Sequence, residues 1–156
     1  MWDTINKGNW KNIESRCRLL PALDYIVYSG VMGIFTLPNG VSVSLDTNEK
    51  YPIPKFLWKI VISPLRQEGI AFMVLHNPLA SDNEVRRFLQ LFGSGGSFSC
   101  FNYRWFTRED TENRQKGYLV CCTISTLINI LGQLEPGINV PTTILNGPEV
   151  FDMARK

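Results

Sequence analysis

The feature that most constrains the fold is a pair of apolar runs separated by a short link. Residues 56–62 and 70–75 are rich in branched and aromatic side chains, and the link from Pro64 to Gly69 has the composition of a turn. Parallel strands need a crossover of roughly a dozen residues or more, which this link cannot supply. The sequence therefore predicts an antiparallel pair of strands at the centre of the molecule.

An amphipathic helix is predicted near the start of the chain, over residues 6–20. Gly8 suits a helix entrance, and Pro21 disfavours helical geometry in the residue before it. Between them, apolar residues recur at the spacing of one helix face, at Trp10, Ile13, Cys17 and Leu20. We expect this stripe to pack on the sheet.

Shorter strands are predicted between this helix and the central pair. Strand-like runs occupy residues 23–28, 33–37 and 41–45. The sequence Pro-Asn-Gly at 38–40 indicates a hairpin turn between the last two runs, because asparagine and glycine tolerate positive φ.

Downstream of the central pair, the pattern predicts two helices and two more strands. The capping box Ser-Asp-Asn-Glu begins a helix at 81–91, and residues 119–134 indicate a strand followed by a helix. Between these two segments, the aromatic residues Phe101, Tyr103 and Trp105 occupy alternate positions, which predicts one face of a strand. The alternative is an exposed platform on which nucleic-acid bases stack.

Composition indicates a folded domain without strong global attraction for polyanions. Of the 156 residues 44% are hydrophobic and 19% charged, which argues against disorder, and the net charge is only +2. We predict one α+β domain over residues 1–135 and a loop-like tail at 136–156. Basic residues form an early and a late group, which contact phosphates or are merely solvated: Lys7, Lys11, Arg16 and Arg18, then Arg104, Arg108, Arg114 and Lys116.

Three polar side chains in the first predicted helix suggest phosphodiester chemistry. Glu14 and Arg18 lie four residues apart and are neighbours on a helix, and Asn6 falls at or just before its first turn. An amide oxygen can bind a hard divalent cation, a carboxylate can hold its water, and an arginine can bind a phosphate. The alternative is an ordinary surface ion pair with a capping asparagine.

The segment resembles the metal-binding helix of the DNA/RNA non-specific endonuclease family, the ββα-metal nucleases that include secreted Serratia-type enzymes. The family pattern is Asn-x-Gly-x-Trp-x-x-Leu/Ile-Glu-x-x-x-Arg, and its fixed positions match in register at Asn6, Gly8, Trp10, Ile13, Glu14 and Arg18. Residues 24–30, 51–61 and 117–122 resemble later family motifs, respectively a strand ending in Thr-Gly, a Val-Pro-Lys-Tyr-x-Trp-Lys-Val strand and a Gly-Tyr-x-Tyr-Cys-Cys element. The resemblance covers residues 3–122.

The resemblance implies a Mg²⁺-dependent, sugar-non-specific endonuclease, with Mn²⁺ as an alternative metal. Asn6 would be the sole direct protein ligand of the metal, Glu14 would orient its water shell, and Arg18 would bind or neutralise a phosphate of the DNA or RNA backbone. In the family an Arg-Gly-His motif, on a strand before this helix, supplies a histidine base. Only five residues precede Asn6 here, so we expect the amino-terminal half of the fold to be absent and the chain to be inactive alone.

The single histidine, His76, is predicted to be structural or incidental, with replacement of the missing base as the alternative. The absent strands predict an exposed sheet edge that a missing segment or a protein partner would cover. Two other functions stay open: a catalytically silent homologue that binds nucleic acid or a nuclease partner, and a structural domain without activity.

Cysteines and targeting signals give conflicting indications of location. Cys17, Cys100, Cys121 and Cys122 can pair in three ways, and the secreted relatives use disulfides near the double-Cys element. The first residues contain no apolar secretory signal, so the chain is expected to be cytoplasmic if Met1 is the native start. Its longest uncharged apolar run is too short to span a membrane.

Overall fold

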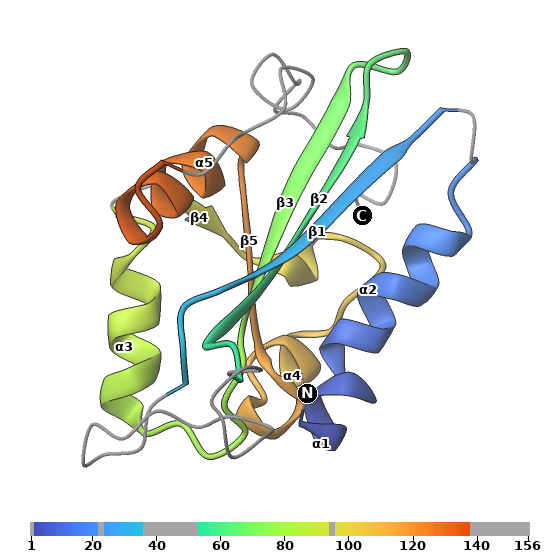
Figure 1. Ribbon diagram of the computed structural model, residues 1–156. Helices are drawn as coiled ribbons and strands as arrows, with labels where there is room; N and C mark the ends of the chain where they lie inside the picture. Colours follow the sequence, from blue (N-terminus) through green and yellow to red (C-terminus); the bar gives the residue numbers. More distant parts are fainter. Residues whose placement is uncertain (1, 22–23, 36–52, 94–95, 138–156) are drawn as a thin grey trace.

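The structure is a computed structural model that describes residues 2–21, 24–35, 53–93 and 96–137. Figure 1 shows a twisted sheet with helices on both faces. The elements in chain order are α1 (Asp3–Asn6), α2 (Asn9–Arg18), β1 (Ile26–Met32), β2 (Phe56–Ser63), β3 (Glu68–Leu75), α3 (Asp82–Gln90), β4 (Ser97–Phe98), the 3₁₀ helix η1 (Cys100–Asn102), α4 (Arg108–Thr111), the 3₁₀ helix η2 (Arg114–Lys116), β5 (Tyr118–Cys122) and α5 (Ile124–Leu134).

The five strands form one antiparallel sheet in the order β1-β2-β3-β5-β4. The central hairpin is confirmed: β2 and β3 pair along their whole lengths, from Phe56 opposite Leu75 to Ser63 opposite Glu68. The predicted α+β class is confirmed as well. No helix among the described segments is long and apolar enough to cross a membrane.

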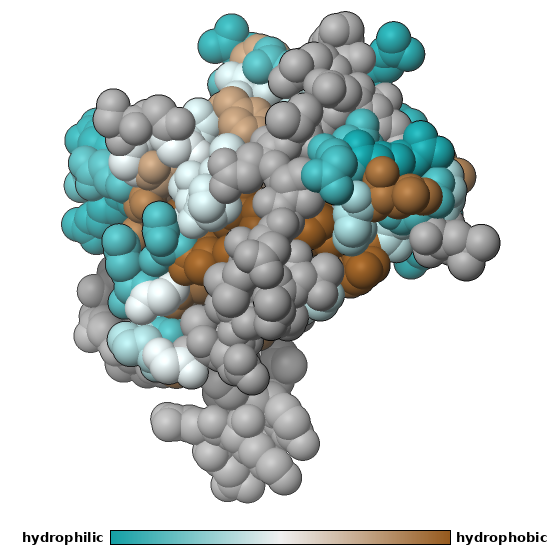
Figure 2. All heavy atoms as spheres, turned by 90° about the horizontal axis from the view of Figure 1, so that it is seen from above, coloured by the Kyte–Doolittle hydropathy of each residue, from teal (hydrophilic) through white to brown (hydrophobic). Residues whose placement is uncertain are grey.

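Two apolar clusters lie on the two faces of the sheet. On one face α1 and α2 contribute Ile5, Trp10 and Ile13, which pack over Leu57 and Val61 of β2. On the other face α3 and α5 pack over alternate positions of the same strands. Seen from the end in Figure 2, apolar residues gather towards the middle and hydrophilic residues flank them. The central strands are therefore buried on both sides.

Two predicted helices begin where their capping residues place them. The Ser81 hydroxyl accepts a hydrogen bond from the Glu84 N–H at 3.2 Å, so α3 starts at the predicted capping box. After β5, the Thr123 hydroxyl accepts from the Thr126 N–H at 3.2 Å and starts α5. The predicted order of strand then helix in this part of the chain is confirmed.

The predicted helix entrance at Gly8 is confirmed, but the expectation that Asn6 belongs to the same helix is wrong. Asn6 is the last residue of α1, and α2 begins only at Asn9, with Gly8 as its N-cap. A Cβ on Gly8 would lie 2.6 Å from the backbone oxygen of Lys116. The chain bends here because η2 approaches its backbone, so Asn6 does not share a helix with Glu14.

The predicted aromatic strand is also wrong. Residues 100–102 form η1 instead, and Cys100 is bonded to Cys121 of β5 in a disulfide. Tyr103 and Phe106 are buried, with the Phe106 ring 5.7 Å from that of Phe72. The aromatic side chains thus fill the core on the α2 face, which explains their number better than an exposed stacking platform does.

Among the described strands, β1 lies at one edge of the sheet, and it starts at Ile26, within the predicted run at 23–28. Its Ile26, Val27 and Val31 side chains are among the exposed apolar residues. Residues 33–35 are not strand, whereas the predicted run at 41–45, the turn at 38–40 and most of the predicted tail lie outside the described residues. Absence of an amino-terminal half, and a partner for this edge, stay predictions.

Candidate functional site

Glu14 and Arg18 lie on α2 beside a lysine from the sheet below. Trp10 and Ile13 are buried against the sheet, whereas Glu14 is half-buried and Arg18 exposed. Both charged groups act electrostatically on Lys59 of β2. The sheet therefore presents an ammonium group under the flank of α2 that carries the predicted carboxylate and guanidinium.

Lys59 is a buried cation that sequence reasoning did not single out. Its Nζ donates a hydrogen bond to the Ser29 hydroxyl at 2.5 Å and lies 4.5 Å from the centre of the Trp10 ring. Burial lowers the pKa of Lys59, while Cys17 and Glu14 oppose that shift. A lysine inside an otherwise apolar strand was the signal that could have identified it.

The strand register explains why two of the family-like motifs occur together. Ser29 and Gly30 of β1 pair with Lys59 and Trp58 of β2. A Cβ on Gly30 would lie 2.3 Å from the Trp58 ring, so only glycine leaves room for that indole. The Ser-Gly and Trp-Lys pairs thus form one unit, with Lys59 and its acceptor on the α2 face.

Asn6 is exposed at the end of α1, and no described residue hydrogen-bonds to its side chain. Its amide oxygen is therefore available to a ligand. The geometry brings Glu14 and Arg18 together around Lys59 but records no contact between Asn6 and either of them. The role of Asn6 as a metal ligand stays a prediction.

The donor groups fit a hard cation that keeps most of its water. The described segments contain no group of three or more histidine, cysteine, aspartate or glutamate side chains that could enclose a metal. Mg²⁺ needs no such cage, because it is commonly held by one or two protein oxygens, water and substrate phosphate. The Asn6 amide oxygen and the Glu14 carboxylate are oxygen donors of the required kind.

His76 is a structural residue, as predicted. Its Nε2 accepts a hydrogen bond from the Trp2 N–H at 3.1 Å, and its Nδ1–H donates to the Pro54 oxygen at 2.7 Å. The side chain is fully buried, and burial lowers its pKa. Neither ring nitrogen is free to take a proton from a nucleophile.

The two free thiols are also shielded. Burial raises the pKa of Cys17, which lies beside Lys59, to about 11, and that of Cys122 to about 12. Thiolates are the reactive form of cysteine, so neither residue is poised as a nucleophile near neutral pH.

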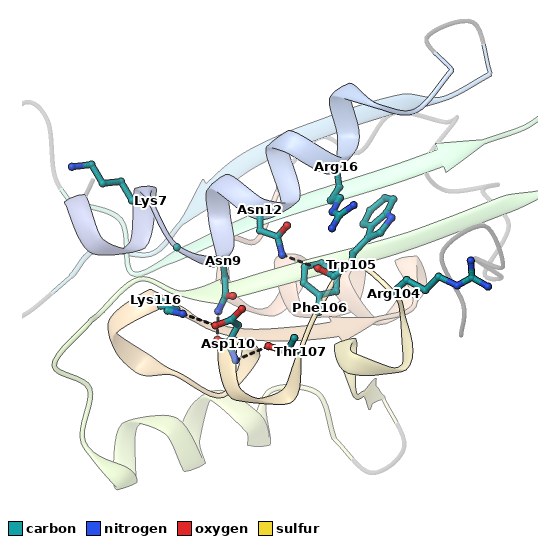
Figure 3. Close-up of a pocket in the computed structure, with 11 residues that line it drawn as sticks. Lys7, Asn9, Asn12, Arg16, Arg104, Trp105, Phe106, Thr107, Asp110 and Lys116 are labelled. Carbon is teal, nitrogen blue, oxygen red and sulfur yellow. Dashed lines mark hydrogen bonds and ion pairs between the residues drawn. The ribbon is translucent and has the colours of Figure 1, made fainter.

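A basic pocket of about 390 Å³ lies between α2 and the segment 104–116 (Figure 3). Two asparagines of α2 connect the two walls of the pocket by hydrogen bonds. The Asn12 Nδ2 donates to the Trp105 oxygen at 2.8 Å, and the Asn9 Nδ2 donates to the oxygens of Asp110 and Gly117 at 2.6 and 2.7 Å. Its cationic lining comes from both basic groups of the sequence, namely Lys7 and Arg16, and Arg104 and Lys116.

Comparison with known proteins identifies a nuclease family and two related salivary proteins. The family model described as DNA/RNA non-specific endonuclease matches residues 2–127. A protein described as salivary endonuclease from Lutzomyia longipalpis is 31% identical over 83 residues, covering 49% of this chain and 20% of the relative. The salivary protein Tsal2A of Glossina morsitans morsitans is 23% identical over 116 residues, covering 72% of this chain and 28% of the relative. No solved structure matches.

The matched region contains every element from α1 to β5 and the start of α5. The chain spans less than a third of the length of each of these two relatives.

Proposed function

The chain belongs to the DNA/RNA non-specific endonuclease family, and on that premise we propose that it supplies the metal- and phosphate-binding part of a site that hydrolyses DNA and RNA. The observation that carries this proposal is the placement of Glu14 and Arg18 around Lys59 on one flank of α2. The order of these residues along the helix is the order of the family motif.

Each side chain has a separate task in the proposed site. Asn6 binds the divalent metal, Mg²⁺ or Mn²⁺, through its amide oxygen, and Glu14 accepts hydrogen bonds from water in the metal's shell. Arg18 binds a non-bridging oxygen of the phosphate. When bound, the metal stabilises negative charge on the oxygen that leaves phosphorus. The ammonium group of Lys59 contributes a positive charge close enough to Glu14 and Arg18 to interact with both.

We place the general base outside this chain. The only histidine of the sequence is His76, and both of its ring nitrogens are hydrogen-bonded to the backbone. Because both relatives are more than three times longer than the part they share with this chain, the base can lie on a segment that the chain does not contain.

A second candidate function is a catalytically silent protein that binds nucleic acid. The hydrogen bonds made by both ring nitrogens of His76 favour this function, because binding of nucleic acid needs no general base. The two functions differ in one measurable property: the nuclease site binds a divalent metal through Asn6, whereas a silent binder has no need of one.

The disulfide between Cys100 and Cys121 supports a secreted setting for the protein. Disulfides persist in oxidising compartments and are rare in the cytosol. This favours the location expected from the family over the cytoplasmic one inferred from the first residues.

Metal titration tests the proposed role of Asn6. We expect Asn6→Ala and Glu14→Gln to weaken Mn²⁺ binding by about tenfold or more, because each removes an oxygen that holds the ion or its water. Calorimetry with Mn²⁺ measures this. Asn129→Ala, at an exposed asparagine of α5, is the matched control, and thermal melting confirms that every variant folds. Equal Mn²⁺ affinity in the wild type and the three variants would show that Asn6 and Glu14 do not form a metal site.

A further inference from the structure

The basic pocket lies on the other flank of α2 from Glu14 and Arg18. A residue advances about 100° around an α-helix, so Arg16 and Arg18 project on nearly opposite sides, about 160° apart. Arg16 and Asn12 point from α2 towards Trp105 in Figure 3, whereas Lys7 and Arg104, at the two ends of the pocket, extend outward. One short helix thus separates the candidate metal site from a second polar site.

The charge of the pocket is not balanced within the described residues. Lys116 pairs with Asp110, and Lys7 pairs with Asp3 at 3.0 Å. Arg16 and Arg104 have no carboxylate partner among the described residues. Two guanidinium groups therefore remain for an anionic ligand.

The walls of the pocket are fixed before any ligand arrives. Three hydrogen bonds from Asn9 and Asn12 join α2 to the segment 104–117, and Gly8 allows the Lys116 backbone to approach. A pocket of about 390 Å³ is within the range that holds small ligands. Because the helix and the facing segment are already joined, a ligand need order only the arginine side chains.

We propose that this basic pocket binds a backbone phosphate of DNA or RNA at a position other than the scissile one. A phosphodiester carries one negative charge and two non-bridging oxygens, which match the fork of a guanidinium. The inference rests on the proposed function, which supplies nucleic acid as the substrate. Phosphate contacts carry no base information, in agreement with a family that cleaves without sequence specificity.

The two flanks of α2 then have different roles. Arg18 contacts the phosphate where cleavage occurs, and Arg16 with Arg104 fixes the strand at a neighbouring phosphate. The early and late basic groups, distant in sequence, act at the same strand because the Asn9 and Asn12 hydrogen bonds hold them on facing walls.

Fluorescence anisotropy tests the inference without any need for catalysis. The full chain is titrated against labelled single-stranded RNA and double-stranded DNA oligonucleotides in EDTA, at several salt concentrations. We expect Arg16→Gln and Arg104→Gln each to weaken binding about tenfold at low salt. Each should also reduce the slope of log affinity against log salt by about 0.7 for the RNA and about 0.9 for the DNA. Arg87→Gln, which removes an exposed arginine from α3, should change neither.

Further arms separate failure of the pocket from failure of the proposed function. Binding that is weakened by Arg18→Gln but unchanged by Arg16→Gln and Arg104→Gln overturns the pocket and leaves the proposed function intact. No binding by the wild-type chain at low salt overturns both. Competition by polyglutamate that equals competition by unlabelled RNA identifies a general polyanion surface and overturns the phosphate assignment. Thermal melting of each variant excludes loss of the fold as the cause.

Discussion

The ring of His76 lies between two backbone groups, the N–H of Trp2 and the oxygen of Pro54. It therefore joins the start of α1 to the segment that enters β2. Only the neutral ring satisfies both partners, because Nε2 must accept while Nδ1 donates. A histidine is the usual general base in this kind of chemistry, but both ring nitrogens of His76 are used in hydrogen bonds that stabilise the fold.

This commitment predicts a pH dependence of stability. Burial lowers the pKa of His76 in the folded chain, so as pH falls below about 6.5 the unfolded chain takes up a proton that the folded chain does not. Stability is therefore lost on acidification. Between about pH 7.5 and 5.5 we expect the free energy of unfolding to fall, by at most about 1.4 kcal/mol for each pH unit from this single group.

Urea unfolding of the wild type and of His76→Gln at both pH values checks this prediction. The variant lacks the titrating group, so its free energy of unfolding should change less over the same range, whatever its absolute stability. Identical pH dependence in the two proteins would contradict the account of His76.

At the level of elements, local signals specified some boundaries and long-range contacts specified others. Capping hydroxyls at Ser81 and turn composition at Pro64 act on adjacent residues, so α3 and the β2–β3 hairpin could be predicted. The break at Gly8 arises from its contact with Lys116, more than a hundred residues away, and no helical periodicity reveals it. For the same reason the Cys100–Cys121 pairing could not be chosen from spacing alone.

The close approach at Gly8 predicts a specific cost for a side chain there. Gly8→Ala would place Cβ 2.6 Å from the Lys116 oxygen and 2.8 Å from its Cα, which are backbone atoms that cannot rotate away. We expect a loss of about 1–3 kcal/mol in the free energy of unfolding. The same contact forms one end of the basic pocket, so binding of nucleic acid should weaken as well.

Gly132→Ala is the matched control, because nothing lies within 4 Å of a Cβ at that position of α5. Alanine favours a helix interior over glycine by about 0.5–1 kcal/mol, so this variant should be more stable than the wild type. Denaturant unfolding of both variants measures the difference. A Gly8→Ala protein as stable as the wild type would show that α2 and η2 are not in close contact.

At the scale of the whole molecule, two polar sites lie on opposite flanks of α2: the candidate site at Glu14 and Arg18, and the basic pocket. Residues of β2 and β1 place Lys59 under Glu14 and Arg18, while the segment before β5 places Arg104 across from Arg16. The motif on α2 could be predicted from sequence, because its residues are close along the chain. Lys59 and the pocket could not, since they depend on which strands and loops face that helix.

In the proposed function, this chain carries the metal-binding and phosphate-binding residues of a nuclease but no available base. Plasmid and RNA cleavage in Mg²⁺, with and without added imidazole, tests it most directly, since free imidazole can take the place of a missing histidine side chain. We predict no cleavage without imidazole. With imidazole we predict slow cleavage by the wild type and by His76→Gln, abolished by EDTA and by Glu14→Gln. Cleavage by the wild type without imidazole, lost in His76→Gln, would make His76 the base and contradict the account.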